Sequence, residues 1–235
     1  MVPRIPQQDR IDDSELTPPY WRYFARLIRP FPDFDLFFAR GLRERAVEKL
    51  RLAPGDRVMD LGCGPGASFP YLVEAVIESG LVVGVEISPE VVINARKRIQ
   101  KHGWKNVHLI TANALNLSFD EKFDAVLMMG APDIYGSPAI LKNLVRYLRL
   151  GARFAAFGAK LSRRPGAKRI NPLFRSFVSK ASFVSTPLLE FEPWGLLKEH
   201  SASFNVEECL FGLMFLAWGE MLVEEKPFSP ALQRT

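Results

Sequence analysis

The chain has 235 residues, of which 48% are hydrophobic and 24% are charged, so it is long enough for one α/β domain and has the composition of a soluble globular protein. A net charge of +5 permits an anionic partner without requiring one, and no apolar run approaches the length of a membrane span. The stretch "MVPRIPQQDRIDDSEL" lacks the apolar core of a signal peptide, and the two cysteines, Cys63 and Cys209, form no CxxC pair. We therefore expect a cytoplasmic protein with no disulfide and no metal site.

Two helices are predicted before the first strand. The stretch "SELTPPYWRYFARLIR" has an aromatic helical pattern with two prolines at its entrance. The stretch "DLFFARGLRERAVEKL" places apolar residues at helical spacing. We expect residues 1–41 to form a helical cover with a frayed tail.

From residue 57 onward, short apolar segments alternate with helical patterns. The strand candidates are 57–61, 81–87, 106–111, 123–129 and 152–158. The helix candidates between them are 67–79, 89–102 and 138–149. Strands that alternate with helices predict a mainly parallel sheet covered on both faces, in a doubly wound α/β fold.

The alternation breaks after residue 158. The segment 160–202 is apolar and aromatic, and we expect helices near 171–182 and 194–200 with a loop marked by proline between them. The stretch "SASFNVEECLFGLMFLAWGEM" has the pattern of two strands that meet around 210–212, which predicts a terminal hairpin at a sheet edge. Residues 222–235 are expected to form a tail.

A glycine-rich loop follows the first strand in "VMDLGCGPGAS". The glycine spacing also fits the dinucleotide fingerprint, so it indicates a nucleotide without identifying it. Asp60 stands two residues before the first glycine, where a carboxylate would repel a pyrophosphate. A carboxylate there favours a cationic ligand, and S-adenosylmethionine carries positive charge on its amino group and on its sulfonium.

Two further strand ends carry groups suited to a nucleoside. Glu86 ends the second strand and can accept hydrogen bonds from both ribose hydroxyls, while Ile87 can lie against an adenine face. Asn113 follows the third strand and offers an amide oxygen to the exocyclic amine of adenine. The backbone N–H of Ala114 can donate to a ring nitrogen of the same base.

The motifs "VMDLGCGPG", "VVGVEIS", "TANAL", "FDAVLMM" and "LVRYLRLGARFAAFG" occur in this order, and together they resemble the successive motifs of class I S-adenosylmethionine-dependent methyltransferases. The resemblance covers roughly residues 42–159. It implies a seven-stranded, mostly parallel Rossmann-like sheet whose last strand runs antiparallel to the others. It also implies a methyltransferase domain over 42–221, with 160–202 as an elaboration on the substrate side.

The same resemblance implies that the cofactor S-adenosyl-L-methionine, whose product is S-adenosyl-L-homocysteine, binds at the glycine loop. Asp60 and the glycine backbone would hold the methionine part, Glu86 the ribose, and Asn113 with Ala114 the adenine. The predicted cofactor site comprises Asp60, Gly62, Cys63, Gly64, Gly66, Glu86, Ile87, Asn113, Ala114 and Met129. Many relatives have Asp in place of Asn113; because Asn keeps the acceptor oxygen and loses only the charge, we expect adenine recognition to survive.

The methyl acceptor should enter beside the carboxyl end of the fourth strand, where the chain reads "MMGAPDIYG". Asp133 and Tyr135 are the polar candidates for catalysis there, and a turn residue and a packing aromatic are the equally weighted alternatives. His200 closes a helix on the presumed substrate side and is the third candidate. The cofactor carries the activated methyl group, so a general base is needed only where the acceptor must lose a proton.

Two segments rich in aromatic residues, 18–38 and 170–197, flank the predicted site and indicate an enclosed, lipophilic pocket. We expect methyl transfer to a small apolar or aromatic molecule, such as a quinone precursor, a lipid or a secondary metabolite. The alternatives are an RNA or protein methyltransferase, a non-catalytic S-adenosylmethionine-binding subunit and, less favoured, a dehydrogenase. No nucleic-acid partner is expected, because the sequence contains no recognisable nucleic-acid-binding module.

Basic residues gather beside the second aromatic segment, in "LSRRPGAKRI". The plainer interpretation is a solvated loop, because a Pro-Gly pair lies in the middle of the cluster. The sharper interpretation is peripheral contact with an anionic membrane surface.

Overall fold

The computed structural model describes residues 37–181 and 191–223, together with a few positions of the N-terminal segment: Tyr23, Arg26, Leu27, 29–31 and Asp33. The first predicted helix and most of the predicted tail lie outside the described residues. The same holds for the loop over 182–190.

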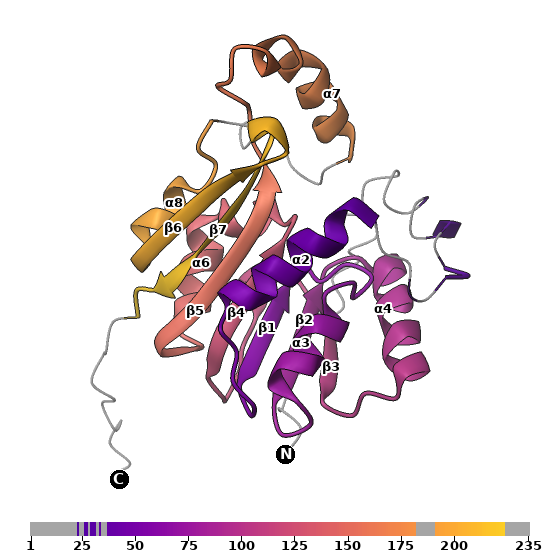
Figure 1. The fold of residues 1–235 in the computed structure, drawn as a ribbon. Helices are drawn as coiled ribbons and strands as arrows, with labels where there is room; N and C mark the ends of the chain where they lie inside the picture. The colour runs from indigo at the N-terminus through magenta and orange to yellow at the C-terminus, as the bar shows by residue number, and fades with distance from the viewer. Residues whose placement is uncertain are drawn as a thin grey trace.

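The centre of the molecule is a seven-stranded sheet with the strand order β3-β2-β1-β4-β5-β7-β6 (Figure 1). The strands are β1 (Arg57–Leu61), β2 (Leu81–Glu86), β3 (Val107–Thr111), β4 (Phe123–Met129), β5 (Leu148–Ala159), β6 (Ser201–Cys209) and β7 (Met214–Met221). β7 runs antiparallel to both of its neighbours, and the other pairs are parallel. The predicted α/β fold, with its closing hairpin at one edge of the sheet, is confirmed.

Helices cover both faces of this sheet (Figure 1). They are α2 (Phe37–Lys49), α3 (Phe69–Val76), α4 (Pro89–His102), α5 (Pro132–Tyr135), α6 (Pro138–Val145) and α8 (Gly195–Glu199), while α7 (Asn171–Ala181) lies beyond the end of the sheet. Short 3-10 turns lie in three connections: η2 (Ala114–Asn116) between β3 and β4, η3 (Ala167–Arg169) between β5 and α7, and η5 (Leu210–Gly212) between β6 and β7. The start of α4 is fixed by Pro89, and its end by Gly103 in the left-handed conformation, which glycine adopts without strain.

The strand side chains alternate between two hydrophobic cores, one on each face of the sheet. Val58 packs with apolar residues of α2, α3 and α4, whereas the adjacent Met59 packs on the opposite face with residues of α5, α6 and α8. Because both faces of the sheet are covered, β1, β2 and β4 are buried along nearly their whole length. This is the reason that these strands could be located from their predominantly apolar sequences.

The boundary between α6 and β5 differs from the prediction. A helix was expected over 138–149, but α6 ends at Val145 and β5 begins at Leu148. Leu148 pairs with Phe123 ahead of a register shift in the β4–β5 ladder, and Gly151 has a φ of 75° at this irregularity. An irregular strand start of this kind leaves no periodic signal in the sequence.

The order of the strands determines where a ligand site is expected. From β1 the chain adds strands outward to β3, then returns to β4 on the other side of β1, so the order of strands reverses between β1 and β4. Ligands of open α/β sheets bind outside the carboxyl ends of the strands at such a reversal. The glycine loop after β1 and the turn after β4 both lie there.

Candidate functional site

The glycine loop is anchored on the neighbouring strand by its backbone. The amides of Gly62 and Cys63 both donate to the carbonyl oxygen of Val85, at 2.8 and 3.0 Å. Gly62 has a φ of 71°, and a Cβ atom at this position would lie 2.9 Å from the Cβ of Ala131. Only glycine combines this conformation with so close an approach to the turn after β4.

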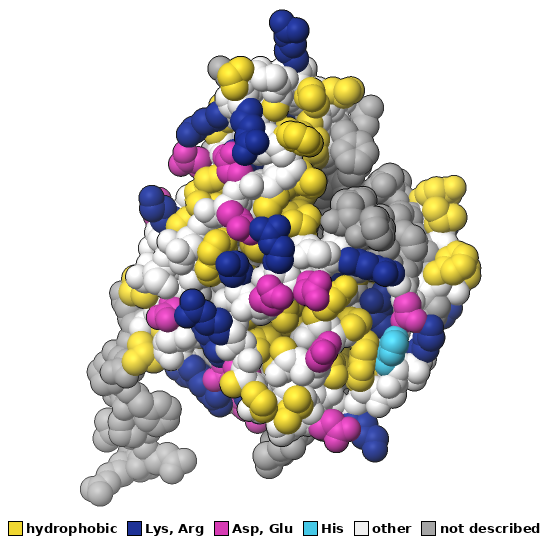
Figure 2. Space-filling model, in the orientation of Figure 1, with side chains coloured by type: hydrophobic (Ala, Val, Ile, Leu, Met, Phe, Trp, Pro, Cys, Tyr) yellow, Lys and Arg dark blue, Asp and Glu magenta, His cyan; other side chains and the backbone are white. Residues whose placement is uncertain are grey.

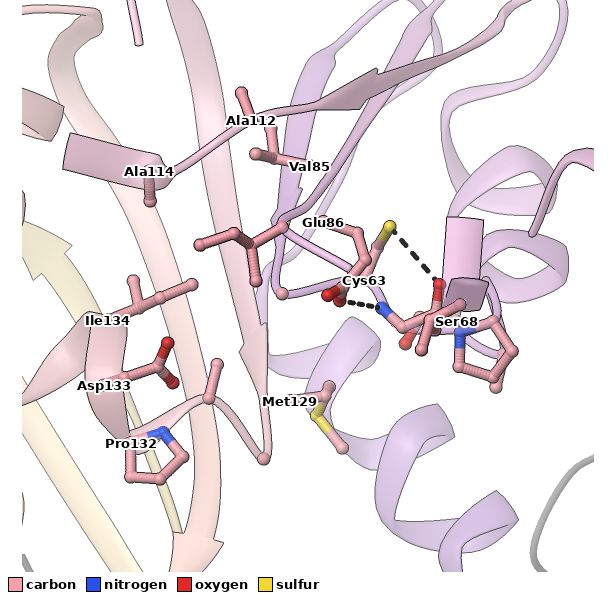
Figure 3. A pocket seen from close by; sticks show the side chains of 18 of the residues that line it. Cys63, Ser68, Val85, Glu86, Ala112, Ala114, Met129, Pro132, Asp133 and Ile134 are labelled. Atoms are coloured by element: carbon pink, nitrogen blue, oxygen red, sulfur yellow. Dashed lines mark hydrogen bonds between the residues drawn. The ribbon is translucent and has the colours of Figure 1, made fainter. Parts of the chain in front are cut away.

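A pocket opens between the glycine loop, the end of β2 and the turn after β4 (Figure 3). Its volume is about 200 Å³, many times the roughly 10–15 Å³ that one ordered water needs, so it can hold part of a ligand as well as water. Eight of the ten residues predicted to hold the cofactor line it: Gly62, Cys63, Gly64, Glu86, Ile87, Asn113, Ala114 and Met129. Asp60 and Gly66 lie behind the loop and do not face the pocket directly.

Asp60 is the most unusual group near the site. Its side chain is fully buried, and neither carboxylate oxygen has a hydrogen-bond partner among the described residues. Burial raises the pKa of Asp60 to about 7, with Arg43 opposing and Glu86 adding to the increase. A buried carboxylate without a hydrogen-bond partner among the described residues is costly, which makes the end of β1 a candidate site for a cationic ligand.

Glu86 lies at the end of β2 with its carboxylate turned toward the loop (Figure 3). One carboxylate oxygen accepts from the amide of Gly64 at 3.0 Å, and the other accepts from the amide of Ser88 at 2.9 Å. Burial raises the pKa of Glu86 to about 7, and these two hydrogen bonds oppose the increase. Each carboxylate oxygen keeps a second lone pair, so the group can still accept hydrogen bonds from a ligand.

The opposite end of the pocket is formed by the turn after β3. Asn113 caps η2, and its side-chain oxygen accepts from the amide of Leu115 at 2.9 Å. Asn113 and Ala114 line the pocket together with the apolar side chains of Ile87 and Met129. This part of the pocket therefore combines apolar side chains with polar groups, the kind of lining on which binding of an adenine ring was predicted.

Cys63 has the surroundings of a structural side chain. Its thiol is buried beside Gly64, and burial together with the charges of Asp60 and Glu86 raises its pKa well above the usual range. A thiol in this state stays protonated and is a poor nucleophile.

The structure separates the three residues predicted for catalysis. Asp133 lines the pocket from α5, and its carboxylate faces the same space as Glu86 from the other side (Figure 3). The side chain is accessible from the pocket, yet the surrounding walls remove enough water to raise the pKa of Asp133. An aspartate with a raised pKa in a pocket is a candidate acid or base.

Tyr135 and His200 lie away from the pocket. Tyr135 is buried in the core, where its ring stacks edge-to-face on Phe215 with centroids 5.7 Å apart. His200 caps the end of α8, and its Nδ1 lies 2.9 Å from the carbonyl oxygen of Leu196. Because β6 starts at the next residue and runs parallel to β1, His200 lies at the amino edge of the sheet, opposite the pocket. Packing and topology therefore bring neither side chain to the reacting groups.

One pocket residue carries a charge that sequence reasoning missed. Arg43 reaches the pocket from α2, and its positive charge lowers the pKa of the nearby Asp60. The sequence predicted the helix and its apolar face, but the side of the sheet on which α2 packs depends on contacts far apart in the chain. The pocket also includes Ser68 and the apolar side chains of Ala131, Pro132, Ile134 and Ile140, which no motif marked.

The residues present fit S-adenosylmethionine. Asp60 supplies an unpartnered negative charge for a cationic group, Glu86 supplies acceptor capacity for ribose hydroxyls, and Arg43 supplies the positive charge for a carboxylate. A pyrophosphate would instead place negative charge beside both buried acids. The donor and acceptor set thus favours a zwitterionic nucleoside over a dinucleotide.

Comparison with known proteins places the same region in one family. A family profile described as "Methyltransferase domain" matches residues 52–164. A demethylmenaquinone methyltransferase of Alkalihalophilus pseudofirmus is 26% identical over 200 residues, covering 81% of this chain and 80% of that protein. A 2-phytyl-1,4-naphtoquinone methyltransferase of Nostoc is 34% identical over 116 residues, covering 48% of this chain and 51% of that protein.

A solved structure shares the fold. The S-adenosylmethionine-dependent methyltransferase of Aquifex aeolicus superposes with a TM-score of 0.57 at 19% identity, over 85% of this chain and 98% of that chain. At this identity the likeness concerns the arrangement of strands and helices.

Proposed function

Because the chain belongs to the class I S-adenosylmethionine-dependent methyltransferases, we propose that it transfers a methyl group to a small aromatic acceptor of the quinone type. The observation that carries this proposal is Asp60 at the end of β1, a fully buried carboxylate whose two oxygens have no hydrogen-bond partner among the residues that the structure describes. A cationic ligand at the glycine loop would compensate this charge.

In the proposed complex, Asp60 stabilises the amino group of the cofactor and Glu86 accepts from the ribose hydroxyls. Asn113 and Ala114 recognise the adenine, and Ile87 and Met129 pack against it. Bound S-adenosylmethionine supplies a methyl group already activated by the sulfonium. The work left to the protein is to position the acceptor and to exclude water, and good positioning contributes up to about 7–11 kcal/mol.

The acceptor is proposed to lie against the turn after β4. Ala131, Pro132, Ile134 and Ile140 give this wall of the pocket an apolar surface suited to an aromatic ring. Asp133 faces the same space and takes the proton that a ring hydroxyl of a reduced quinone releases as the new bond forms. The two quinone-type relatives support an acceptor of this class.

Two measurements test the proposal in order. Calorimetry of the full chain should detect binding of S-adenosylhomocysteine, and absence of binding would overturn the cofactor assignment. Transfer of a labelled methyl group should then be followed on a chemically reduced, prenylated naphthoquinone. Transfer to RNA or protein with none to the quinol would replace the acceptor class, and binding without transfer to any acceptor would favour a non-catalytic subunit.

A further inference from the structure

Large apolar side chains are exposed together where α7 and the β6–β7 hairpin project beyond the carboxyl edge of the sheet (Figure 1). Phe211 is 79% exposed and Leu210 50% exposed at η5, the tip of the hairpin. Leu173 is 74% exposed on α7, and Ile170, just before this helix, is 49% exposed. We call these four residues the tip surface; apolar side chains gather in this part of the molecule in Figure 2.

The tip surface is held as one unit by a buried serine. The hydroxyl of Ser162 donates to the carbonyl oxygen of Phe211 at 2.9 Å, and the Ser162 amide donates to the side chain of Asn171 at 3.0 Å. The Asn171 side chain donates back to the Ser162 carbonyl at 2.9 Å. The first residue of α7 and the hairpin tip are therefore fixed relative to each other, so their exposed side chains form a defined surface.

The backbone at the tip is unfavourable for the residues it carries. Leu210 has a φ of 47° and Phe211 a φ of 58°, in the left-handed region that glycine or asparagine occupies more easily. The turn nevertheless presents two bulky apolar side chains to solvent. Strain that persists at an exposed apolar pair points to a use for these side chains outside the folded core.

Arginines surround the apolar side chains. Arg164, Arg169 and Arg175 are exposed, and Arg164 lies at the hairpin tip, where its Nε would be 3.5 Å from a Cβ at Gly212. Basic side chains appear beside the apolar ones in this region of Figure 2. Exposed aromatic and aliphatic groups flanked by arginines match the interface of an anionic bilayer, which offers acyl chains and negative headgroups at the same depth.

We propose that the tip surface docks the protein on an anionic lipid bilayer. Within the described residues, no helix is long and apolar enough to cross a membrane. The contact proposed is peripheral: Phe211, Leu210, Leu173 and Ile170 enter the interfacial layer, and the three arginines bind headgroups. The surface lies at the same sheet edge as the pocket, so under the proposed function a lipophilic acceptor would reach the site from the bilayer.

Vesicle binding tests the proposal without any measurement of methyl transfer. The full chain is sedimented with vesicles of phosphatidylcholine alone or with phosphatidylglycerol added. We expect binding to the anionic vesicles that weakens with salt. Phe211→Asn combined with Leu173→Ser should lower binding about tenfold or more, since each removes an apolar group that the bilayer would bury. Replacing Arg164, Arg169 and Arg175 by Ser should lower it about fivefold for each charge removed.

Matched substitutions at the opposite edge of the sheet serve as controls. Leu150→Ser removes a side chain that is 69% exposed, and Arg146→Ser removes an exposed charge; both should leave vesicle binding unchanged. Thermal unfolding should show that all variants remain folded. The proposal is overturned if the wild type binds neither vesicle at low salt, or if the control variants lose as much binding as the tip variants. Self-association that Phe211→Asn abolishes, without vesicle binding, would assign the surface to a second copy instead.

Discussion

Two buried charged side chains, one on each side of the sheet, differ in whether the fold supplies a partner. Beside β1 and β2, Asp60 is buried with no partner in the described chain. Beside β5 and β6, Lys160 is equally buried, but its ammonium pairs with Glu208 at 2.5 Å and lies 5.7 Å from the centre of the Trp194 ring. The lysine is paired within its own fold, whereas the aspartate would gain a partner only from a cationic ligand, as the proposed function requires. Of these two buried charges, Asp60 is therefore the candidate for ligand binding, and Lys160 is the structural one.

The two sides of the pocket also differ in whether their polar and aromatic side chains face the pocket or the core. On the cofactor side, polar groups at adjacent strand ends converge on one loop, as Glu86 does on Gly64. On the acceptor side, the aromatic rings of Tyr135, Phe215 and Trp194 pack on one another and build core. Asp133 is the polar side chain of this region that reaches the pocket. Substitutions can test whether this division between cofactor chemistry and core packing is correct.

The largest effect is expected for Asp133→Asn. If this carboxylate takes the acceptor proton, its removal should lower kcat about 100-fold or more while leaving S-adenosylhomocysteine binding intact. The base works in its deprotonated form, and the pKa of Asp133 is raised by desolvation. Turnover of the wild type should therefore fall as the pH drops through a pKa above the usual range of Asp. An unchanged kcat and pH profile would remove Asp133 from the mechanism.

Asp60→Asn should weaken S-adenosylhomocysteine binding about 10- to 100-fold, because hydrogen bonds to charged groups contribute about 1.5–3 kcal/mol. The same change should stabilise the ligand-free protein, since it removes an unpartnered buried charge. Calorimetry and thermal unfolding measure the two effects separately. Weaker binding together with lower stability would mean that Asp60 supports the fold.

The pH dependence of stability follows from the same group. The pKa of Asp60 rises from 3.8 to about 7 on folding, so between these values the folded state holds more protons than the unfolded state. The free energy of unfolding of the ligand-free protein should therefore fall as the pH rises through this window. Asp60→Asn should reduce this slope and leave the part that comes from Glu86, whose pKa is also raised to about 7; an unchanged slope would contradict the raised pKa of Asp60.

Gly158→Ala tests the packing role of the acceptor side. A Cβ at this position would lie 2.0 Å from the Tyr135 hydroxyl and 2.9 Å from the Phe215 ring. Overpacking of this kind should cost about 1–3 kcal/mol in the free energy of unfolding. Tyr135→Phe removes the closest atom and should restore part of the loss in the double variant. As a single change it should leave turnover nearly intact, and a large loss of kcat would return Tyr135 to the catalytic set.

The smallest effect is expected for His200→Ala. His200 lies at the amino edge of the sheet, with its Nδ1 close to the Leu196 carbonyl. The change should lower the free energy of unfolding by at most about 0.5 kcal/mol. It should alter kcat and KM by less than about twofold. Steady-state kinetics at two pH values check this. A selective loss of kcat would show that this end of the molecule takes part in the reaction.

The sequence by itself determined the cofactor side. Strands that are buried on both faces are rich in apolar residues and can be located from the sequence. The loop after β1 has positive φ angles at Gly62, Gly64 and Gly66, so its conformation is also specified by its local sequence. Eight predicted cofactor residues reach the pocket because they lie at the ends of parallel strands, where sequence position largely fixes spatial position. The closing hairpin was predictable for the same local reason.

Only the tertiary structure decided the acceptor side. Asp133 and Tyr135 are two residues apart on α5, yet one faces the pocket and the other the core, because positions two apart in a helix lie about 200° apart around its axis. Arg43 reaches the pocket through the packing of α2, and His200 is carried away from it by the direction of β6. These placements depend on contacts between distant segments, which local patterns of charge and hydrophobicity do not encode.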